Sequence, residues 1–374
     1  MIRLMLLLSL SVTSGVSLAR AQNFEQLWNV CQSDMRNEET LGSCSAVISS
    51  GRVTGKALAG AFINRGVVYD HLGQYDTAIQ DFDQAIKLDP NLSLAFMNRG
   101  VAHLHKRAFD QAIRDFDEAL KTDRHFLAFF NRGLAYAYKG QYQRAIRDFN
   151  QALVLNPDSV EALTYRGMAL HRNGQNELAM KDYDQVIKLV PTNAQALASR
   201  GSLYVAAGKY DRAIEDFDRS IKVAPNNPQA FSDRGSAYLS KGQYDQAIQD
   251  YDQSIKLAPN VAIGFNNRGI AYSRAGQYDR AMEDFDRALK LDPTSARALT
   301  NRGIAYVRMN QLDAAIATFD SAYRMNRRNS PALFGRGIAK RKKGDIAGGD
   351  ADMAAAAAMS PDVAEFMASE GVTP

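Results

Sequence analysis

The 374-residue chain contains little of several residue types on which common functional sites depend. Two cysteines are too few for a disulfide-dense scaffold or for a zinc site made of several cysteines. Five histidines and one tryptophan leave little material for a histidine-rich metal centre. No charge sign dominates, because 45 Lys and Arg residues are balanced by 41 Asp and Glu residues. With 23% charged and 46% apolar residues, the composition is typical of a globular chain rather than a disordered one.

Long hydrophobic runs are also missing, and the short one at the start has the features of a secretory signal peptide. Arg3 provides a positive start, residues 4–10 are apolar, and Ala19-Arg20-Ala21 is a small-x-small cleavage signal. The apolar run is too short to anchor the chain in a bilayer. We therefore expect a signal peptide over residues 1–21, cleavage before Gln22, and an exported protein of the periplasm or extracellular space that does not span the membrane. An uncleaved amphipathic start is the alternative.

The main feature of the sequence is an internal repeat. The dipeptide Arg-Gly recurs every 34 residues, with one step of 33, at Arg65, Arg99, Arg132, Arg166, Arg200, Arg234, Arg268, Arg302 and Arg336. Taking each Gly as the eighth position, the units begin at residues 59, 93, 126, 160, 194, 228, 262, 296 and 330. The array then runs over residues 59–363. Self-similarity at a period of this length is the signature of a repeat architecture.

Each unit has the pattern of two antiparallel helices joined by a turn at a glycine. In the first unit, apolar residues recur at helical spacing on both sides of Gly73, and Pro90 closes the unit. The small residues Gly66 and Ala78 leave room for aromatic neighbours such as Phe82. One hairpin cannot bury that much aromatic surface alone, so the hairpins must stack.

The spacing of aromatic residue, Gly, Tyr, Ala, Phe or Tyr, Ala and Pro in all nine units resembles the tetratricopeptide repeat. This resemblance implies an all-α fold, a right-handed α-solenoid of tandem helix-turn-helix units. One position departs from the usual family pattern, because Arg replaces Leu before the Gly in every unit. The Arg-Gly form is similar to a variant of bacterial tetratricopeptide proteins.

The nine arginines in register suggest either structural ion pairs or a stripe that binds phosphate or nucleic acid. Antiparallel helices bring the seventh and twenty-third positions of a unit level with each other. The twenty-third position is Asp in eight units and Thr318 in the remaining one. We therefore favour structural pairs and expect no nucleic-acid partner. The first three pairs are Arg65 with Asp81, Arg99 with Asp115, and Arg132 with Asp148.

A second charge pattern places an acid four residues before a base on the second helix of most units. Such pairs stabilise an exposed helix by roughly 0.2–0.5 kcal/mol each, so we expect a solvated outer face without function. The seven pairs are Asp83–Lys87, Asp117–Lys121, Asp184–Lys188, Asp218–Lys222, Asp252–Lys256, Asp286–Lys290 and Asp320–Arg324.

The ends of the array are predicted to be caps. Residues 22–58 form a further helical hairpin without the repeat signature, and Cys31 and Cys44 lie level on its two helices. In an oxidising compartment these cysteines should form a disulfide, which adds about 3 kcal/mol in the chain-entropy model. A reactive thiol is the alternative, but a CxxC spacing is missing. Residues 364–374 form a C-terminal cap or tail.

The resemblance also implies that the first helix of each unit lines a concave groove, where a ligand would bind. We expect that groove to be apolar in the early units and cationic in the late ones. The alternatives are that the apolar residues contact the amino-terminal hairpin or another copy of the chain, and that the basic residues are solvated surface. The candidate groove residues are Ile63, Asn64, Leu94, Met97, Asn98, Leu127, Phe130, Asn131, Tyr138, Arg274 and Arg308.

Catalytic motifs are missing from the sequence. His71, His105 and His171 fall on groove positions, but no acidic or cysteine partner has a spacing that would orient them. His103 replaces a core tyrosine and is expected to pack. We therefore predict an exported, non-enzymatic scaffold that binds a protein or peptide segment, without metal or cofactor, and with homo-oligomers possible. The alternatives are a self-associating structural element of the cell envelope and, last, an envelope enzyme.

Overall fold

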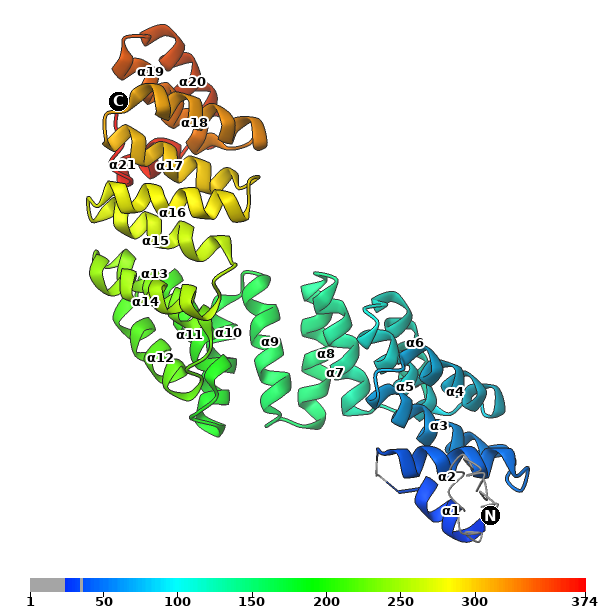
Figure 1. Ribbon diagram of the computed structural model, residues 1–374. Coiled ribbons are helices and arrows are strands. Elements are labelled where there is room, and N and C mark those ends of the chain that lie inside the picture. The colour runs from blue at the N-terminus through cyan, green and yellow to red at the C-terminus, as the bar shows by residue number, and fades with distance from the viewer. Residues whose placement is uncertain (1–23, 34–35) are drawn as a thin grey trace, which may run out of the picture. The chain divides into compact units, whose positions relative to one another are not determined.

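The computed structural model describes residues 24–33 and 36–374, so the predicted signal peptide of residues 1–21 lies outside the described residues and stays a prediction. The described residues form 21 α-helices and no strand, and consecutive helices pack in pairs (Figure 1). This is the all-α solenoid architecture that the repeat predicts. The chain forms two compact units, one ending at Gln175 and the other beginning at Asn176, which we describe separately.

The N-terminal unit contains a helical hairpin followed by seven further helices. Their bounds are α1 (Phe24–Cys31), α2 (Glu38–Ser49), α3 (Gly55–His71), α4 (Tyr75–Leu88), α5 (Ser93–His105), α6 (Phe109–Thr122), α7 (Phe126–Tyr138), α8 (Tyr142–Leu155) and α9 (Val160–Arg172). Within this unit α3 packs on α4, α5 on α6 and α7 on α8, and each second helix also packs on the first helix of the next pair.

The C-terminal unit continues in the same way. Its helices are α10 (Asn176–Leu189), α11 (Ala194–Ala206), α12 (Tyr210–Val223), α13 (Pro228–Ser240), α14 (Tyr244–Leu257), α15 (Ala262–Arg274), α16 (Tyr278–Leu291), α17 (Ala296–Arg308), α18 (Leu312–Met325), α19 (Ser330–Lys343), α20 (Ile346–Met359) and α21 (Val363–Ser369). From residue 93 on, every predicted unit start is the first residue of a helix, whereas α3 begins four residues before residue 59. The division into segments 22–58, 59–363 and 364–374 stays a prediction.

The turn inside each hairpin needs a left-handed residue. Gly73 has a φ of 74°, and glycine takes this conformation without the steric cost that a Cβ atom brings. Two units place a side chain there instead, Arg107 at φ 58° and Asn310 at φ 56°. The turn geometry is therefore kept even where the preferred residue is missing.

A close contact between a glycine and an aromatic ring holds the two helices of a unit together. Phe82 of α4 is fully buried, and a methyl group placed on Gly66 of α3 would lie 2.6 Å from its ring. Such a distance is too short for a Cβ atom, so the ring needs the glycine. The same contact recurs in the pairs Gly100–Phe116, Gly133–Phe149, Gly201–Phe217, Gly235–Tyr251, Gly269–Phe285 and Gly303–Phe319.

Both ends of the described chain have their own apolar cluster. The predicted disulfide between Cys31 and Cys44 is present, and it joins α1 to α2 beside the buried Val47 and Ala61. At the other end, α21 buries Val363 and Met367 in the cluster built by α17 to α20. These contacts cover apolar surface that the terminal repeats would otherwise expose to water.

We predict that Gly66→Ala destabilises the protein, whereas Gly60→Ala does not. Both glycines lie in α3, but an added methyl on Gly60 meets no atom within 4 Å, while on Gly66 it collides with Phe82. Overpacking of this kind costs about 1–3 kcal/mol, and an uncrowded Gly→Ala change in a helix gains up to about 1 kcal/mol. Thermal unfolding followed by circular dichroism gives the unfolding midpoints of the wild type and of the two variants, and their order checks the prediction. Equal midpoints for the two variants would contradict the packing argument.

Candidate functional site

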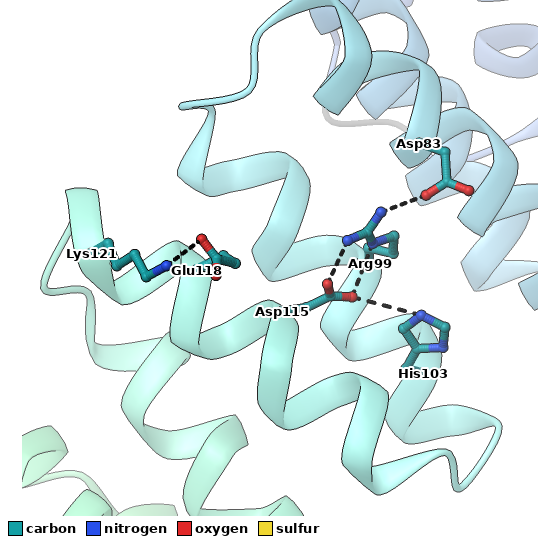
Figure 2. Close-up of polar contacts among 6 residues, drawn as sticks. All are labelled: Asp83, Arg99, His103, Asp115, Glu118 and Lys121. Carbon is teal, nitrogen blue, oxygen red and sulfur yellow. Dashed lines mark hydrogen bonds and ion pairs between the residues drawn. The ribbon is translucent and has the colours of Figure 1, made fainter.

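In most units the repeated arginine is held by the aspartate that lies level with it. Arg99 donates from Nε to Asp115 Oδ2 at 3.0 Å and from Nη2 to Oδ1 at 2.6 Å (Figure 2). The planar guanidinium matches a carboxylate in this bidentate geometry, so the pair fixes the relative orientation of the two side chains in addition to balancing their charges. The same arrangement occurs in Arg65–Asp81, Arg132–Asp148, Arg200–Asp216, Arg234–Asp250, Arg268–Asp284 and Arg336–Asp352.

In most later units the third nitrogen of the guanidinium bonds a carboxylate of the preceding unit, whereas the first arginine of the array, Arg65, donates from Nη1 to Ser45 Oγ at 3.3 Å. Arg99 Nη1 donates to Asp83 Oδ1 at 2.6 Å, and Figure 2 shows the guanidinium between Asp83 and Asp115. The corresponding contacts are Arg132–Asp117, Arg200–Asp184, Arg234–Asp218, Arg268–Asp252, Arg302–Asp286 and Arg336–Asp320. We call these pairs within and between units the arginine ladder.

The prediction that the acids and bases four residues apart pair with each other was wrong, although most of these aspartates are exposed as expected. Among the described residues, only Asp320–Arg324 of the seven predicted pairs forms, at 2.5 Å. Lys121 instead contacts Glu118 at 2.7 Å (Figure 2). The physical reason is that a half-buried guanidinium of the next unit needs compensation more than a solvated lysine does. The aspartates therefore join neighbouring repeats.

The ladder also keeps its arginines charged and occupied. The hydrogen bonds with Asp216 raise the pKa of Arg200 above its ordinary value. Burial raises the pKa of Asp250, and the hydrogen bond from Arg234 opposes that rise. The guanidinium of Arg65 also lies over the ring of Phe62, 5.6 Å from its centroid. With their nitrogens bonded in this way, these arginines have little left to offer a phosphate.

Two positions depart from the pattern of the ladder. Asn150 takes the place of an aspartate and accepts from Arg166 Nη1 at 2.8 Å, so a neutral amide makes that contact. In the unit that has Thr318, the buried Nε of Arg302 has no hydrogen-bond partner. A buried donor without an acceptor costs free energy, which makes Thr318 a weak position of the structure.

Four of the predicted groove residues come together in the N-terminal unit. Ile63, Asn64, Leu94 and Asn98 line a cavity of about 220 Å³, together with Ser33, Arg36, Thr40, Val67 and Val68. We call it the cap cavity, because the α1–α2 hairpin forms one wall.

The four groove residues of the cap cavity have different roles. Ile63 is 3% exposed and belongs to the core, whereas Leu94 is 47% exposed. Asn64 donates to the carbonyl oxygen of Cys31 at 2.9 Å, so its amide holds the cap and is not free for a ligand. Asn98 makes no side-chain hydrogen bond within the part of the chain that the structure describes.

The other early candidates lie outside the cap cavity. Phe130 is a packing residue, because its ring stacks on Phe126 at 5.7 Å and meets Tyr165 edge-on at 5.7 Å. Tyr138 is 61% exposed and stacks on Phe109. Leu127 is exposed, and Met97 and Asn131 are half-buried.

The two late basic candidates are not solvated surface, so that alternative interpretation of the sequence was wrong for them. In the C-terminal unit, Arg274 Nη2 lies 2.5 Å from Glu370 Oε1, and Arg308 Nε donates to the backbone carbonyl of Glu370 at 2.9 Å. Burial lowers the pKa of Arg308. Both residues line a second cavity, of about 660 Å³, which we call the arginine cavity. Sequence reasoning could not find this contact, because Glu370 lies 96 residues from Arg274.

The histidines also have neighbours that spacing within a repeat did not reveal. His105 Nδ1 lies 3.0 Å from Asp70 Oδ1 of the preceding unit, so the expectation of no acidic partner was wrong. His103 packs with its Nε2 3.7 Å from Asp115 (Figure 2), and burial lowers its pKa. Among residues 24–33 and 36–374, no group of three His, Cys, Asp or Glu side chains could hold a metal ion.

The comparisons with known proteins identify the family. Models described as tetratricopeptide repeat match residues 59–92, 130–194, 199–262, 262–295 and 285–317, which together are more than half of the chain. The chain belongs to the tetratricopeptide-repeat family, whose fold suggests a scaffold for protein–protein interaction. None of the curated proteins matches this chain in sequence.

Solved structures of low sequence identity share the fold. A tetratricopeptide repeat protein from Parabacteroides merdae is 20% identical with a TM-score of 0.54, over 66% of this chain and 98% of that one. Yeast Tom70 is 13% identical with a TM-score of 0.51, over 93% and 95%. The APC/C hetero-tetramer Cut9–Hcn1 is 14% identical with a TM-score of 0.54, over 88% and 80%.

We predict that Thr318→Asp stabilises the protein, because it gives the buried Nε of Arg302 the carboxylate that other units have. A hydrogen bond to a charged group contributes about 1.5–3 kcal/mol before desolvation of the new carboxylate is subtracted, so we expect a net gain of about 1 kcal/mol. The thermal unfolding midpoint measures it. Ala317→Asp is the matched control, since it adds the same charge at the exposed neighbouring position. An increase no larger than that of the control would contradict the ladder argument.

Proposed function

We propose that this protein is an exported, non-enzymatic scaffold that binds a segment of another protein along the concave groove formed by its first helices. The observation that carries the proposal is the cap cavity, where an exposed leucine and an unoccupied asparagine amide lie side by side on α5. Membership of the tetratricopeptide-repeat family supports a role in protein–protein interaction.

The chemistry of the cap cavity suits a peptide. An extended peptide, or the end of a helix, has backbone N–H and C=O groups without hydrogen-bond partners. The Asn98 amide can donate a hydrogen bond to such a carbonyl and accept one from such an N–H group. Leu94 offers apolar area to a side chain of the ligand, while Arg36 adds an exposed polar group to the lining. An apolar patch with a polar rim is a common feature of interaction surfaces.

The arrangement of the described residues gives less support to a catalytic function than to a binding function. An enzyme needs a nucleophile, an acid–base pair or a metal that faces a cavity. The His105–Asp70 pair lines neither the cap cavity nor the arginine cavity. We therefore propose a binding role and not a catalytic one.

Self-association is the second candidate, because some large apolar residues are exposed away from the cap cavity. Val154 on α8 is 73% exposed, and Tyr138 is 61% exposed. A second copy of the chain could cover such residues. Light scattering over a concentration series distinguishes this candidate, since a monomer at every concentration would remove it.

Export is proposed from two features. The pattern of residues 1–21 is that of a cleaved signal, and the Cys31–Cys44 disulfide favours an oxidising compartment. Separately, among the helices that the structure describes, none has both the length and the apolar character needed to cross a bilayer.

We predict that Leu94→Glu prevents partner binding through the groove, whereas Val154→Glu leaves it unchanged. Each variant puts the same charge at an exposed apolar residue, but only Leu94 lines the cap cavity. We expect capture of a partner from envelope extract to fall at least about tenfold with the first variant, since a charge buried against apolar surface costs more than about 1.4 kcal/mol. Quantitative mass spectrometry of the captured proteins measures it. Recovery of the same partners by both variants would refute the groove hypothesis.

We further predict that the mature protein begins at Gln22 and contains no free thiol. Intact mass spectrometry of protein from the fractionated host cell gives the first residue and the thiol count together. Protein that retains residues 1–21 in the cytoplasmic fraction would refute export. A control in which Ala19 and Ala21 are both replaced by Arg should block cleavage without altering the repeats, because both residues precede the described chain.

A further inference from the structure

The C-terminal segment contacts two predicted groove residues of the repeat array. After α21, Glu370 lies against Arg274 of α15 and Arg308 of α17, and Figure 1 draws α21 close to α17. These arginines occupy the same position of two consecutive units. The segment itself is held elsewhere, because Val363, Met367 and Val372 are fully buried apolar residues of the terminal cluster. Its attachment therefore does not depend on Glu370 alone.

The two arginines contact Glu370 in two ways, through its side-chain carboxylate and through its backbone carbonyl oxygen. Arg274 pairs with the carboxylate of Glu370, at 2.5 Å. Arg308 donates to the backbone carbonyl of the same residue and, through Nη1, to Ser273 Oγ at 3.2 Å. The Arg308 Nη2 atom lies 3.8 Å from the carboxylate. The two arginines thus bind a glutamate together with the peptide carbonyl that follows a helix, where the helix dipole favours a cation.

The charges at this place do not balance. In the arginine ladder, Arg99 contacts two carboxylates, Asp83 and Asp115. Here two guanidinium groups share the single carboxylate of Glu370. The buried Nε of Arg274 has no hydrogen-bond partner. One positive charge is therefore left without a matching acid, and a partly buried charge of that kind favours the binding of an anion.

Space for an anion is present beside Glu370. The arginine cavity has a volume of about 660 Å³ and is lined by both arginines, by the hydroxyl-bearing residues Tyr244, Tyr278 and Ser273, and by Ser369 at the end of α21. Hydroxyl groups donate hydrogen bonds to carboxylate oxygens. The volume is within the range of cavities that bind small ligands or single side chains of a peptide.

We propose that the arginine cavity binds a carboxylate of an acidic partner segment and that Glu370 of the chain's own C-terminal segment competes for it. The occupant is a peptide carboxylate because Glu370 already represents that chemistry at the site, both as a carboxylate and as a backbone carbonyl. This inference rests on the proposed function in that the chain binds protein segments. It concerns the C-terminal unit, however, and not the cap cavity.

Glutamate-rich peptides and single charge-removing variants test the proposal. The probe is a fluorescein-labelled hexaglutamate with an amidated C-terminus, and fluorescence anisotropy at low salt measures its dissociation constant. We expect Glu370→Gln to bind the probe at least about fivefold more tightly than the wild type, because the competitor is removed. Arg274→Gln should bind it at least about tenfold more weakly. The same peptide with a free C-terminus shows whether a side-chain or a terminal carboxylate is preferred.

Glu365→Gln is the matched control for general charge. It removes the same charge from the same segment, but Glu365 is exposed and contacts neither arginine. The proposal is overturned if Glu365→Gln tightens binding as much as Glu370→Gln, or if neither the wild type nor Glu370→Gln binds the probe. It is also overturned if inorganic phosphate competes as well as the peptide, since the site would then be a general anion site.

Two further variants keep the test independent of folding and of the cap cavity. If Arg274→Gln loses helical circular dichroism, Arg274→Lys replaces it, since lysine keeps the charge but loses the paired geometry, and it should still weaken binding. Equal binding by a folded Arg274→Lys and the wild type would overturn the proposal. Leu94→Glu should bind hexaglutamate like the wild type, so failure of the groove hypothesis and failure of this proposal give different results.

Discussion

Removing a guanidinium group partly from water costs free energy unless carboxylates are bonded to it. The repeat array is built so that most of its arginines have such carboxylates. Arg99 is bonded to Asp115 of its own unit and to Asp83 of the unit before. The first contact fixes how the two helices of a hairpin face each other. The second fixes how one hairpin sits on the next. The ladder therefore supplies direction and register, while burial of apolar side chains supplies most of the driving force.

The ladder works together with a steric constraint at the next residue along the helix. In most units the glycine that follows the arginine lets an aromatic ring approach the helix backbone, as Phe82 does at Gly66. Adjacent positions therefore serve charge pairing and close packing. Because these contacts use the inner sides of the hairpins, residues such as Leu94 stay exposed on the first helix. Solenoids separate structure from recognition in this way.

Much of this architecture is predictable from the sequence because the same residue pattern occurs in each of the repeats. Helix starts follow from the period, and the Arg99–Asp115 pair follows from antiparallel helices of known pitch. Contacts between units are harder to predict from the sequence, since the Arg99–Asp83 contact depends on how neighbouring hairpins stack. The candidate sites were only partly predictable for the same reason. Nothing in the spacing places the Asn64 amide on the Cys31 carbonyl, or Glu370 on two arginines far from it in sequence. These contacts arise where the regular array meets its irregular ends.

The symmetry of the ladder has a consequence for how such a chain can change in length. Asp83 lies 16 residues before Arg99, and Asp115 lies 16 residues after it. A tandem duplication or loss of one whole 34-residue unit that carries both aspartates therefore keeps an acid on each side of the arginines at the new junction. No compensating substitution is needed at the new junction. Genetic slippage by complete units can thus lengthen or shorten this protein while its folded neighbours keep the contacts they had.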